Sequence, residues 1–276
     1  MTVRVRAKGV GAAAAAAAAG VAAWGHFEAG WVRLETLECE LPRLPGELDG
    51  LRVVHLSDFH LGFPSRGTNA VERAVEWAAE RDPDLVLVTG DLLSRRSGEG
   101  RLRKLVARMP NCFAVLGNHD FAVSRDPFSQ PSELYDLGAA TLLADDARTV
   151  ELRGRRVQIA GLDPRSYRHG RARPERLTDA EADLRILLCH FPGVIDRLEP
   201  GSFDLVLAGH LHAGQVCLPW FGGRLRLSQI RWTYVRGLYE RPAGVLHVSA
   251  GLGTTFVPFR LLARPEATEL TLRSAP

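Results

Sequence analysis

Runs of consecutive apolar residues alternate along this chain with segments whose apolar residues recur at helical spacing. The amphipathic segments predict helices at residues 69–81 and 102–108. The apolar runs predict short buried strands at residues 51–57, 85–89, 113–116, 184–189, 203–208 and 244–249. Continuously apolar strands that alternate with helices are typical of a sheet covered on both faces.

The remaining segments complete one domain. Apolar and polar residues roughly alternate over residues 31–40, which predicts an edge strand, and residues 270–272 form the last strand. Residues 149–152 and 156–160 read as a hairpin, and a helix is expected to begin near Thr178. Neither an internal repeat nor a Gly/Ser-rich linker divides the chain. We therefore expect one α/β domain over residues 31–276, a four-layer α-β-β-α sandwich with two mixed sheets.

The N-terminal residues 1–30 differ from the rest. Arg4, Arg6 and Lys8 precede an uncharged, alanine-rich run at 9–25 that carries no polar stripe. Its length is at the lower limit for a membrane-spanning helix. It predicts a hydrophobic helix that anchors the protein in the cell membrane, with the rest of the chain outside the cytoplasm because positive charge stays inside. A cleaved signal peptide, which would give a secreted protein, and a soluble alanine-rich helix are the alternatives.

Composition excludes few functions. Apolar residues make up 46% and charged residues 24% of the chain, and the net charge is only +3. Almost all basic residues are arginines, without the concentrated basic face that nucleic-acid binding requires, so no nucleic-acid partner is expected. The cysteines show no close pairing, and a disulfide framework is not expected in a domain of this size: Cys39, Cys112, Cys189 and Cys217.

Metal-ligating and titratable side chains directly follow the predicted strands. In order, these residues are Asp58, His60, Asp91, Asn118, His119, Asp120, His190, His210 and His212. Each piece alone has an ordinary explanation, such as a turn, a helix cap or a core histidine. Together they place oxygen and imidazole ligands at the carboxyl ends of several strands, where ligands gather in open α/β sheets. Such a set suits two divalent cations that act in phosphoester hydrolysis.

These segments resemble the calcineurin-like metallophosphoesterase superfamily. Its pattern is D-x-H, G-D-x-x-D, G-N-H-[DE], H and G-H-x-H, and the resemblance extends from about Leu44 to the end of the chain. The run at 248–255 and the run at 209–215 are similar to a membrane-linked bacterial branch. That branch includes phosphodiesterases similar to UDP-2,3-diacylglucosamine hydrolases.

The resemblance implies a role for each residue. Asp58, His60 and His212 would bind the first metal; Asn118, His190 and His210 would bind the second; and Asp91 would bridge them. A hydroxide held between the cations is the nucleophile expected in this family. His119 would face the substrate, with Asp120 orienting its ring. The carboxylate, imidazole and amide ligands suit Mn, Fe, Zn or Co alike.

One position departs from the family pattern. The second aspartate of G-D-x-x-D is replaced by Ser94, which puts a supporting contact in doubt but leaves the ligand set complete. The implied function is hydrolysis of phosphodiester or pyrophosphate bonds in a small molecule or a lipid-linked substrate, such as UDP-2,3-diacylglucosamine or another membrane phospholipid. A phosphomonoesterase, a nuclease of the same superfamily and a metal-binding scaffold without turnover are the alternatives.

Two segments are candidates for substrate contacts. Residues 165–176 hold five arginines and His169; they could bind extra phosphates, or they could be a solvated surface loop. Residues 218–234 combine glycine with Trp220, Phe221, Trp232 and Tyr234. These aromatic residues could form an apolar lip for an acyl chain, but core packing or a rigid hairpin explains them equally well.

Overall fold

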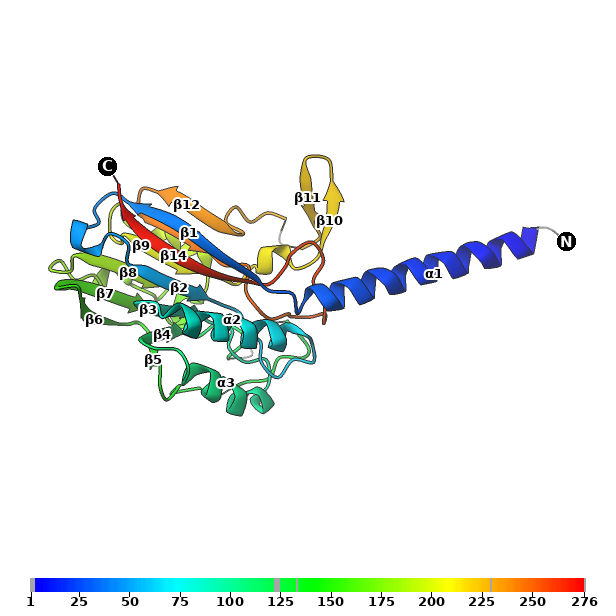
Figure 1. The fold of residues 1–276 in the computed structure, drawn as a ribbon, viewed down its shortest axis with the longest axis horizontal. Helices are drawn as coiled ribbons and strands as arrows, with labels where there is room; N and C mark the ends of the chain where they lie inside the picture. Colours follow the sequence, from blue (N-terminus) through cyan, green and yellow to red (C-terminus); the bar gives the residue numbers. More distant parts are fainter. Residues whose placement is uncertain (1–2, 122–124, 133, 229, 276) are drawn as a thin grey trace.

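Two six-stranded sheets form the centre of the molecule (Figure 1). The computed structural model describes residues 3–121, 125–132, 134–228 and 230–275. The strand order of the first sheet is β1-β14-β2-β3-β4-β5. These strands are β1 (Arg33–Leu41), β2 (Arg52–Leu56), β3 (Leu85–Thr89), β4 (Cys112–Val115), β5 (Thr141–Leu142) and β14 (Glu266–Ser274). Only β14 and β2 pair antiparallel, so the sheet is mixed.

The second sheet is also mixed. Its order is β12-β13-β9-β8-β7-β6, with parallel pairs in the centre and an antiparallel pair at each edge. Its strands are β6 (Asp146–Leu152), β7 (Arg155–Gly161), β8 (Leu184–Leu188), β9 (Leu205–Ala208), β12 (Gly237–Arg241) and β13 (Gly244–Val248). The predicted hairpin corresponds to β6 and β7, and the predicted buried strands correspond to β2, β3, β4, β8, β9 and β13.

The sheets pack face to face through their apolar side chains. Leu87 and Val115 of the first sheet share one core with Ile159, Ile186 and Leu207 of the second. Helices α2 (Gly67–Arg81) and α3 (Glu99–Val106) cover the outer face of the first sheet. Shorter elements cover the outer face of the second: α4 (Pro164–Arg168) and a 3-10 helix at Pro192–Arg197. The α/β class with two mixed sheets is therefore confirmed, and the second helical layer is thinner than the first.

The prediction of a membrane-spanning N-terminal helix is not supported. Helix α1 (Val3–Glu28) extends away from the sheets, and its residues 11–24 are exposed (Figure 1). Within the residues that the structure describes, no helix combines the length and the apolar character needed to cross a membrane. The run consists mainly of alanine and glycine instead of the leucine, isoleucine and phenylalanine that most favour transfer into lipid.

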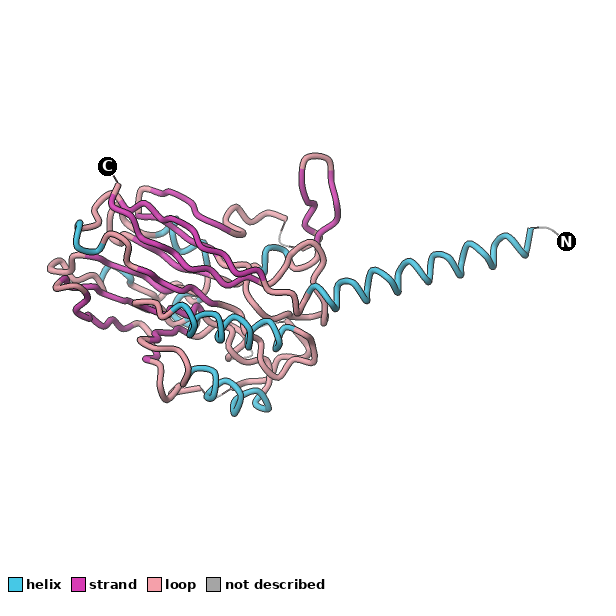
Figure 2. Tube along the Cα trace, viewed as in Figure 1, coloured by secondary structure: helices cyan, strands magenta, loops and turns pink. Residues whose placement is uncertain are grey.

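A two-stranded hairpin stands apart from both sheets, near the base of α1 (Figure 2). It consists of β10 (Cys217–Trp220) and β11 (Gly223–Arg226). The prediction of a helix that begins near Thr178 is wrong, because a 3-10 helix at Pro174–Arg176 is followed there by turns. The other 3-10 helices are Gly46–Leu48, Arg96–Gly98 and His212–Gly214. All four cysteines are free and buried.

Candidate metal centre

The predicted ligands meet where the strands of the two sheets end. Asp58 and Asp91 follow β2 and β3 of the first sheet, and His190 and His210 follow β8 and β9 of the second. Neighbouring parallel strands present their carboxyl ends at the same edge, so side chains far apart in the sequence are brought together. Six of these side chains form two clusters, each with one carboxylate and two imidazoles.

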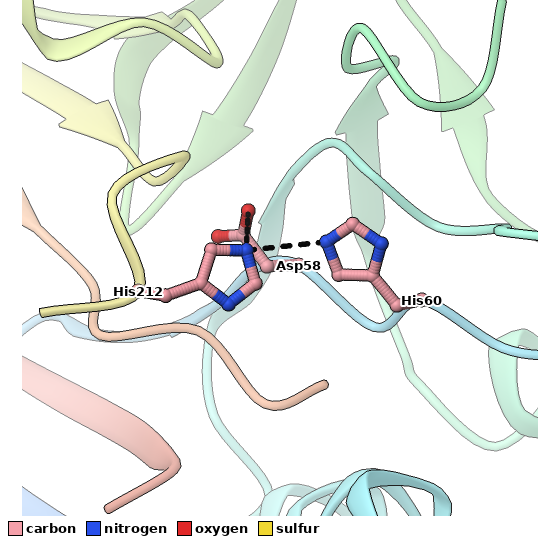
Figure 3. Close-up of side chains that lie close together, drawn as sticks. All are labelled: Asp58, His60 and His212. Carbon is pink, nitrogen blue, oxygen red and sulfur yellow. Dashed lines mark hydrogen bonds and ion pairs between the residues drawn. The ribbon is translucent and has the colours of Figure 1, made fainter. Parts of the chain in front are cut away.

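The first cluster contains Asp58, His60 and His212, whose side chains point toward one another (Figure 3). Nε2 of His212 lies 3.3 Å from Oδ1 of Asp58 and 3.2 Å from Nε2 of His60. Ligand atoms about 2.1 Å from one cation lie about 3.0–3.4 Å apart at octahedral or tetrahedral angles. These separations therefore fit three ligands of a single cation.

The second cluster contains Asp91, His190 and His210. Nε2 of His190 lies 3.2 Å from Oδ2 of Asp91 and 3.1 Å from Nδ1 of His210. The same Asp91 oxygen lies 3.6 Å from Nε2 of His60 in the first cluster. Asp91 therefore stands between the clusters, in a position from which one carboxylate can contact two cations.

Asn118 contributes a buried side-chain oxygen next to these clusters. Its side-chain Oδ1 is buried and has no hydrogen-bond partner among the residues that the structure describes. A buried polar atom without a partner is uncommon and needs a physical explanation. A cation at the second cluster would satisfy this oxygen, and a carboxylate, two imidazoles and an amide oxygen suit a divalent transition metal.

The backbone at this site is strained. Asp58, His60, Asp91, His210 and His212 all have positive φ angles, from 47° to 76°. Residues other than glycine rarely adopt this region, and each such residue costs about 1–3 kcal/mol. Five residues of one site in this conformation show that the surrounding structure holds the side chains in place at the expense of stability, as functional sites often do.

Two glycines allow the close approach of these segments. A Cβ atom at Gly117 would lie 2.1 Å from Oδ1 of Asp91, and one at Gly209 would lie 2.4 Å from Oδ2 of Asp58. Both distances are far below contact distance. The structure therefore requires glycine at these positions of the G-N-H and G-H-x-H segments, because any side chain there would displace a carboxylate of the site.

Neighbouring groups orient the imidazoles. Nδ1 of His190 lies 2.8 Å from the carbonyl oxygen of Thr89, so this nitrogen carries the proton and Nε2 is left as a ligand. Nδ1 of His60 lies 3.0 Å from Oγ of Ser94, the residue that replaces the family's second aspartate. Arg260 is fully buried, and its guanidinium lies 3.1 Å from Nδ1 of His212.

His119 lies beside both clusters, between two carboxylates. Its Nε2 is 4.0 Å from Oδ2 of Asp91, and its Nδ1 is 3.9 Å from Oδ2 of Asp126. Asp120, which we expected to orient the ring, instead accepts hydrogen bonds from the backbone N–H groups of Leu92, Leu93 and Gly117. The carboxylate that faces the outer nitrogen of His119 therefore belongs to Asp126, and Asp120 ties together the loops that carry Asp91 and Asn118.

The site is electrostatically polarised. Burial would raise the pKa of Asp91, but the nearby His190 and His119 rings hold it well below its usual range. Burial would lower the pKa of His190, but Asp91 raises it to about 9. Burial and the charge of Asp91 raise the pKa of Asp120 to about 7. Negative charge is therefore concentrated on Asp91 at the centre of the site, where a cation would be bound.

The chain matches one family model, described as calcineurin-like phosphoesterase, over residues 51–214. The chain belongs to this family. Membership makes it a metal-dependent phosphoester hydrolase, and the family normally uses a dinuclear divalent metal centre. Every site residue named above except Arg260 lies within the matched range.

Relatives in this family match most of the chain. The metallophosphoesterase YkuE of Bacillus subtilis is 30% identical over 84% of this chain and 82% of its own length. YkoQ of the same organism is 27% identical over 79% of this chain and 82% of its own length. The UDP-2,3-diacylglucosamine pyrophosphatase LpxG of Chlamydia trachomatis is 28% identical over 83% of this chain and 85% of its own length.

Two residues beside the site could not be identified from the sequence. Arg260 and Asp126 stand outside every motif, and neither follows a predicted strand. Arg260 donates hydrogen bonds to the carbonyl oxygens of Ala250, Gly251 and Gly253 in the segment after β13. Their contacts with His212 and His119 arise only when distant segments fold together, so no local pattern could have revealed them.

Proposed function

We propose that this protein hydrolyses phosphodiester or pyrophosphate bonds with two divalent cations. Asp58, His60 and His212 would hold the first cation and Asn118, His190 and His210 the second, while Asp91 contacts both. The observation that carries the proposal is the position of one Asp91 oxygen, 3.2 Å from His190 and 3.6 Å from His60. Two cations at these clusters would activate the attacking water and neutralise charge on the phosphate.

His119 is the proposed catalytic acid. Its Nε2 lies 4.0 Å from the shared Asp91 oxygen, so it can reach a phosphate held at the two clusters. From there it would stabilise negative charge or donate a proton to the leaving oxygen. Replacement of His119 by Ala should lower kcat by about 10²–10⁴-fold and leave the bound metal in place. Loss of the metal in this variant would contradict the role.

We further propose that the substrate is linked to a lipid. It is supported by the similarity to LpxG, whose name gives UDP-2,3-diacylglucosamine as its substrate. It is also supported by the hairpin of β10 and β11, whose tip carries Trp220 with 61% and Phe221 with 95% of the surface exposed. Tyr234, from the same aromatic segment, is buried and donates a hydrogen bond to Asp196. The hairpin tip therefore offers apolar surface to an acyl chain, and Trp232 of the same segment is also exposed.

The hairpin can be tested separately from the metal centre. A Trp220→Ser, Phe221→Ser variant should lower kcat/KM on a phospholipid diester in vesicles and leave hydrolysis of a water-soluble diester unchanged. Equal rates of the variant and the wild type on vesicles would contradict the lipid assignment. Faster turnover of phosphomonoesters or DNA than of diesters would favour the alternative substrate classes. Two bound cations with no hydrolysis of any ester would favour a scaffold.

A further inference from the structure

A cavity of about 380 Å³ opens beside the first metal cluster, at the base of the hairpin of β10 and β11. His212 is one of its lining residues and also belongs to that cluster. Pockets that hold small-molecule ligands measure about 300–1,000 Å³. The cavity is therefore large enough for one substituent of a substrate. Because it shares His212 with the cluster, that substituent would lie next to a phosphate held at the two metals.

Gln215 ties two walls of this cavity together. Its side-chain Nε2 donates hydrogen bonds to the carbonyl oxygens of Thr255 at 2.7 Å and of Val257 at 3.2 Å. Its Oε1 accepts a hydrogen bond from the backbone N–H of Thr255 at 3.1 Å. Gln215 and Phe256 have positive φ angles of 52° and 59°, a conformation that residues other than glycine rarely adopt. The surrounding contacts therefore hold both walls in place.

The third wall directly follows β11. The backbone N–H of Leu227 donates a hydrogen bond to the carbonyl oxygen of Val216 at 3.1 Å. Oγ of Ser228 donates one to the carbonyl oxygen of Gly214 at 3.0 Å. The side chain of Leu227 is 52% exposed, so it lies at the mouth of the cavity and can be replaced without opening the core.

The polar groups of the walls are directed to one another and not into the cavity. The hydroxyl of Thr255 and the backbone N–H of Phe256 both donate to Asp126. Backbone N–H groups of three more lining residues donate to neighbouring carbonyl oxygens: Gln215, Val216 and Val257. Lysine and arginine are absent from the described lining residues. A phosphate or a sugar needs donors directed at it, and polar groups buried without partners cost free energy. The cavity is therefore suited to an apolar occupant.

We infer that this cavity binds an aliphatic ester group of the phosphodiester whose phosphorus is held at the two metal clusters. The surface presented to that group is mainly hydrocarbon, from the side chains of Val216, Leu227, Phe256 and Val257. Burial of CH₂ groups against such a surface is favourable. The inference rests on the proposed function and narrows its substrate class. It is separate from the hairpin tip, since neither Trp220 nor Phe221 is among the described lining residues.

The test uses water-soluble diesters that differ only in chain length: methyl, ethyl and butyl para-nitrophenyl phosphate, with the full-length, Mn²⁺-loaded protein. Release of nitrophenolate measures hydrolysis of each. With each added CH₂, kcat/KM should rise by up to about 4-fold, the value of one buried methylene. Leu227→Ser should lower the ratio of kcat/KM for the butyl and methyl diesters about 4-fold or more. Leu225→Ser, on β11 and outside the described lining, is the matched control and should leave this ratio unchanged.

Three results would overturn the inference. They are equal kcat/KM for the methyl and butyl diesters in wild type, an equal fall of the ratio in Leu225→Ser, and faster hydrolysis of a nucleoside nitrophenyl diester than of the butyl diester.

If wild type hydrolyses no diester, the proposed function fails, but the cavity can still be tested by binding. Butylphosphonate should then bind the Mn²⁺-loaded protein at least about 10-fold more tightly than methylphosphonate, and Leu227→Ser should reduce this difference. Equal affinity for the two phosphonates, or binding of neither, would overturn the inference independently of turnover.

Discussion

Nδ1 of His119 lies 3.9 Å from a carboxylate oxygen of Asp126. Asp126 is buried, and the same oxygen accepts hydrogen bonds from Oγ1 of Thr255 at 2.7 Å and from the backbone N–H of Phe256 at 3.1 Å. The loop after β13 therefore fixes the carboxylate that faces His119. The other ring nitrogen of His119, Nε2, lies 4.0 Å from Oδ2 of Asp91, so the ring stands between the two carboxylates.

Replacement of Asp126 by Asn should impair proton donation and not metal binding. The amide retains the shape of the side chain but removes the charge that stabilises a protonated ring. We expect kcat to fall about 10–100-fold. The loss should be larger for a diester with an alkyl leaving group than for a nitrophenyl diester, because only the alkoxide needs a proton. Equal losses for both leaving groups, or loss of bound Mn²⁺, would contradict this role.

A methyl group at Gly117 should disrupt the second metal cluster. The new Cβ would lie 2.1 Å from Oδ1 of Asp91, so this carboxylate must move in a Gly117→Ala variant. We expect weaker binding of at least one cation, measured as metal content after dialysis. Gly100 of α3 is the matched control because a Cβ there meets no atom within 4 Å. Gly100→Ala should keep both cations and raise the stability by about 0.5–1 kcal/mol. Full metal content in Gly117→Ala would contradict the prediction that a Cβ atom at this position displaces Asp91.

Cation binding at pH 7 should release about one proton. Asp91 raises the pKa of His190 to about 9, so the ring is protonated at pH 7 without a cation, whereas a ligand imidazole must be neutral. Asp58 and Asp91 contribute no proton, since neighbouring imidazoles outweigh burial and lower the pKa of both carboxylates. The affinity should therefore rise with pH up to about 9. Calorimetry in buffers of different ionisation enthalpy measures this release, and a value of zero would contradict the His190–Asp91 pairing.

The sequence predicts the parts of this molecule that depend on local pattern. The continuous apolar run Leu85–Thr89 becomes a fully buried strand, and Asp91 lies at its end as expected. The candidate metal ligands could be identified from the sequence because each directly follows such a strand. The chain order of these segments also identifies the family, which the comparison over residues 51–214 confirms.

Features that depend on tertiary contacts could not be predicted. Asp126 and Arg260 contact His119 and His212 through segments distant in the sequence, so no local pattern shows that Asp126 faces the His119 ring. The N-terminal run shows a different limit. Its length and lack of charge suggested a spanning helix, but among the residues that the structure describes no helix is long and apolar enough to cross a membrane.

The most direct test of the account is the number of cations bound by wild type and by Asp91→Asn, with hydrolysis of bis-para-nitrophenyl phosphate in Mn²⁺ measured on the same samples. The exposed carboxylate Asp136, replaced by Asn, is the control. We predict two Mn²⁺ and chelator-sensitive hydrolysis for wild type and for the control. Asp91→Asn should bind fewer cations and lose hydrolysis. Two bound cations with undiminished hydrolysis in Asp91→Asn would contradict the claim that this carboxylate joins a two-metal centre.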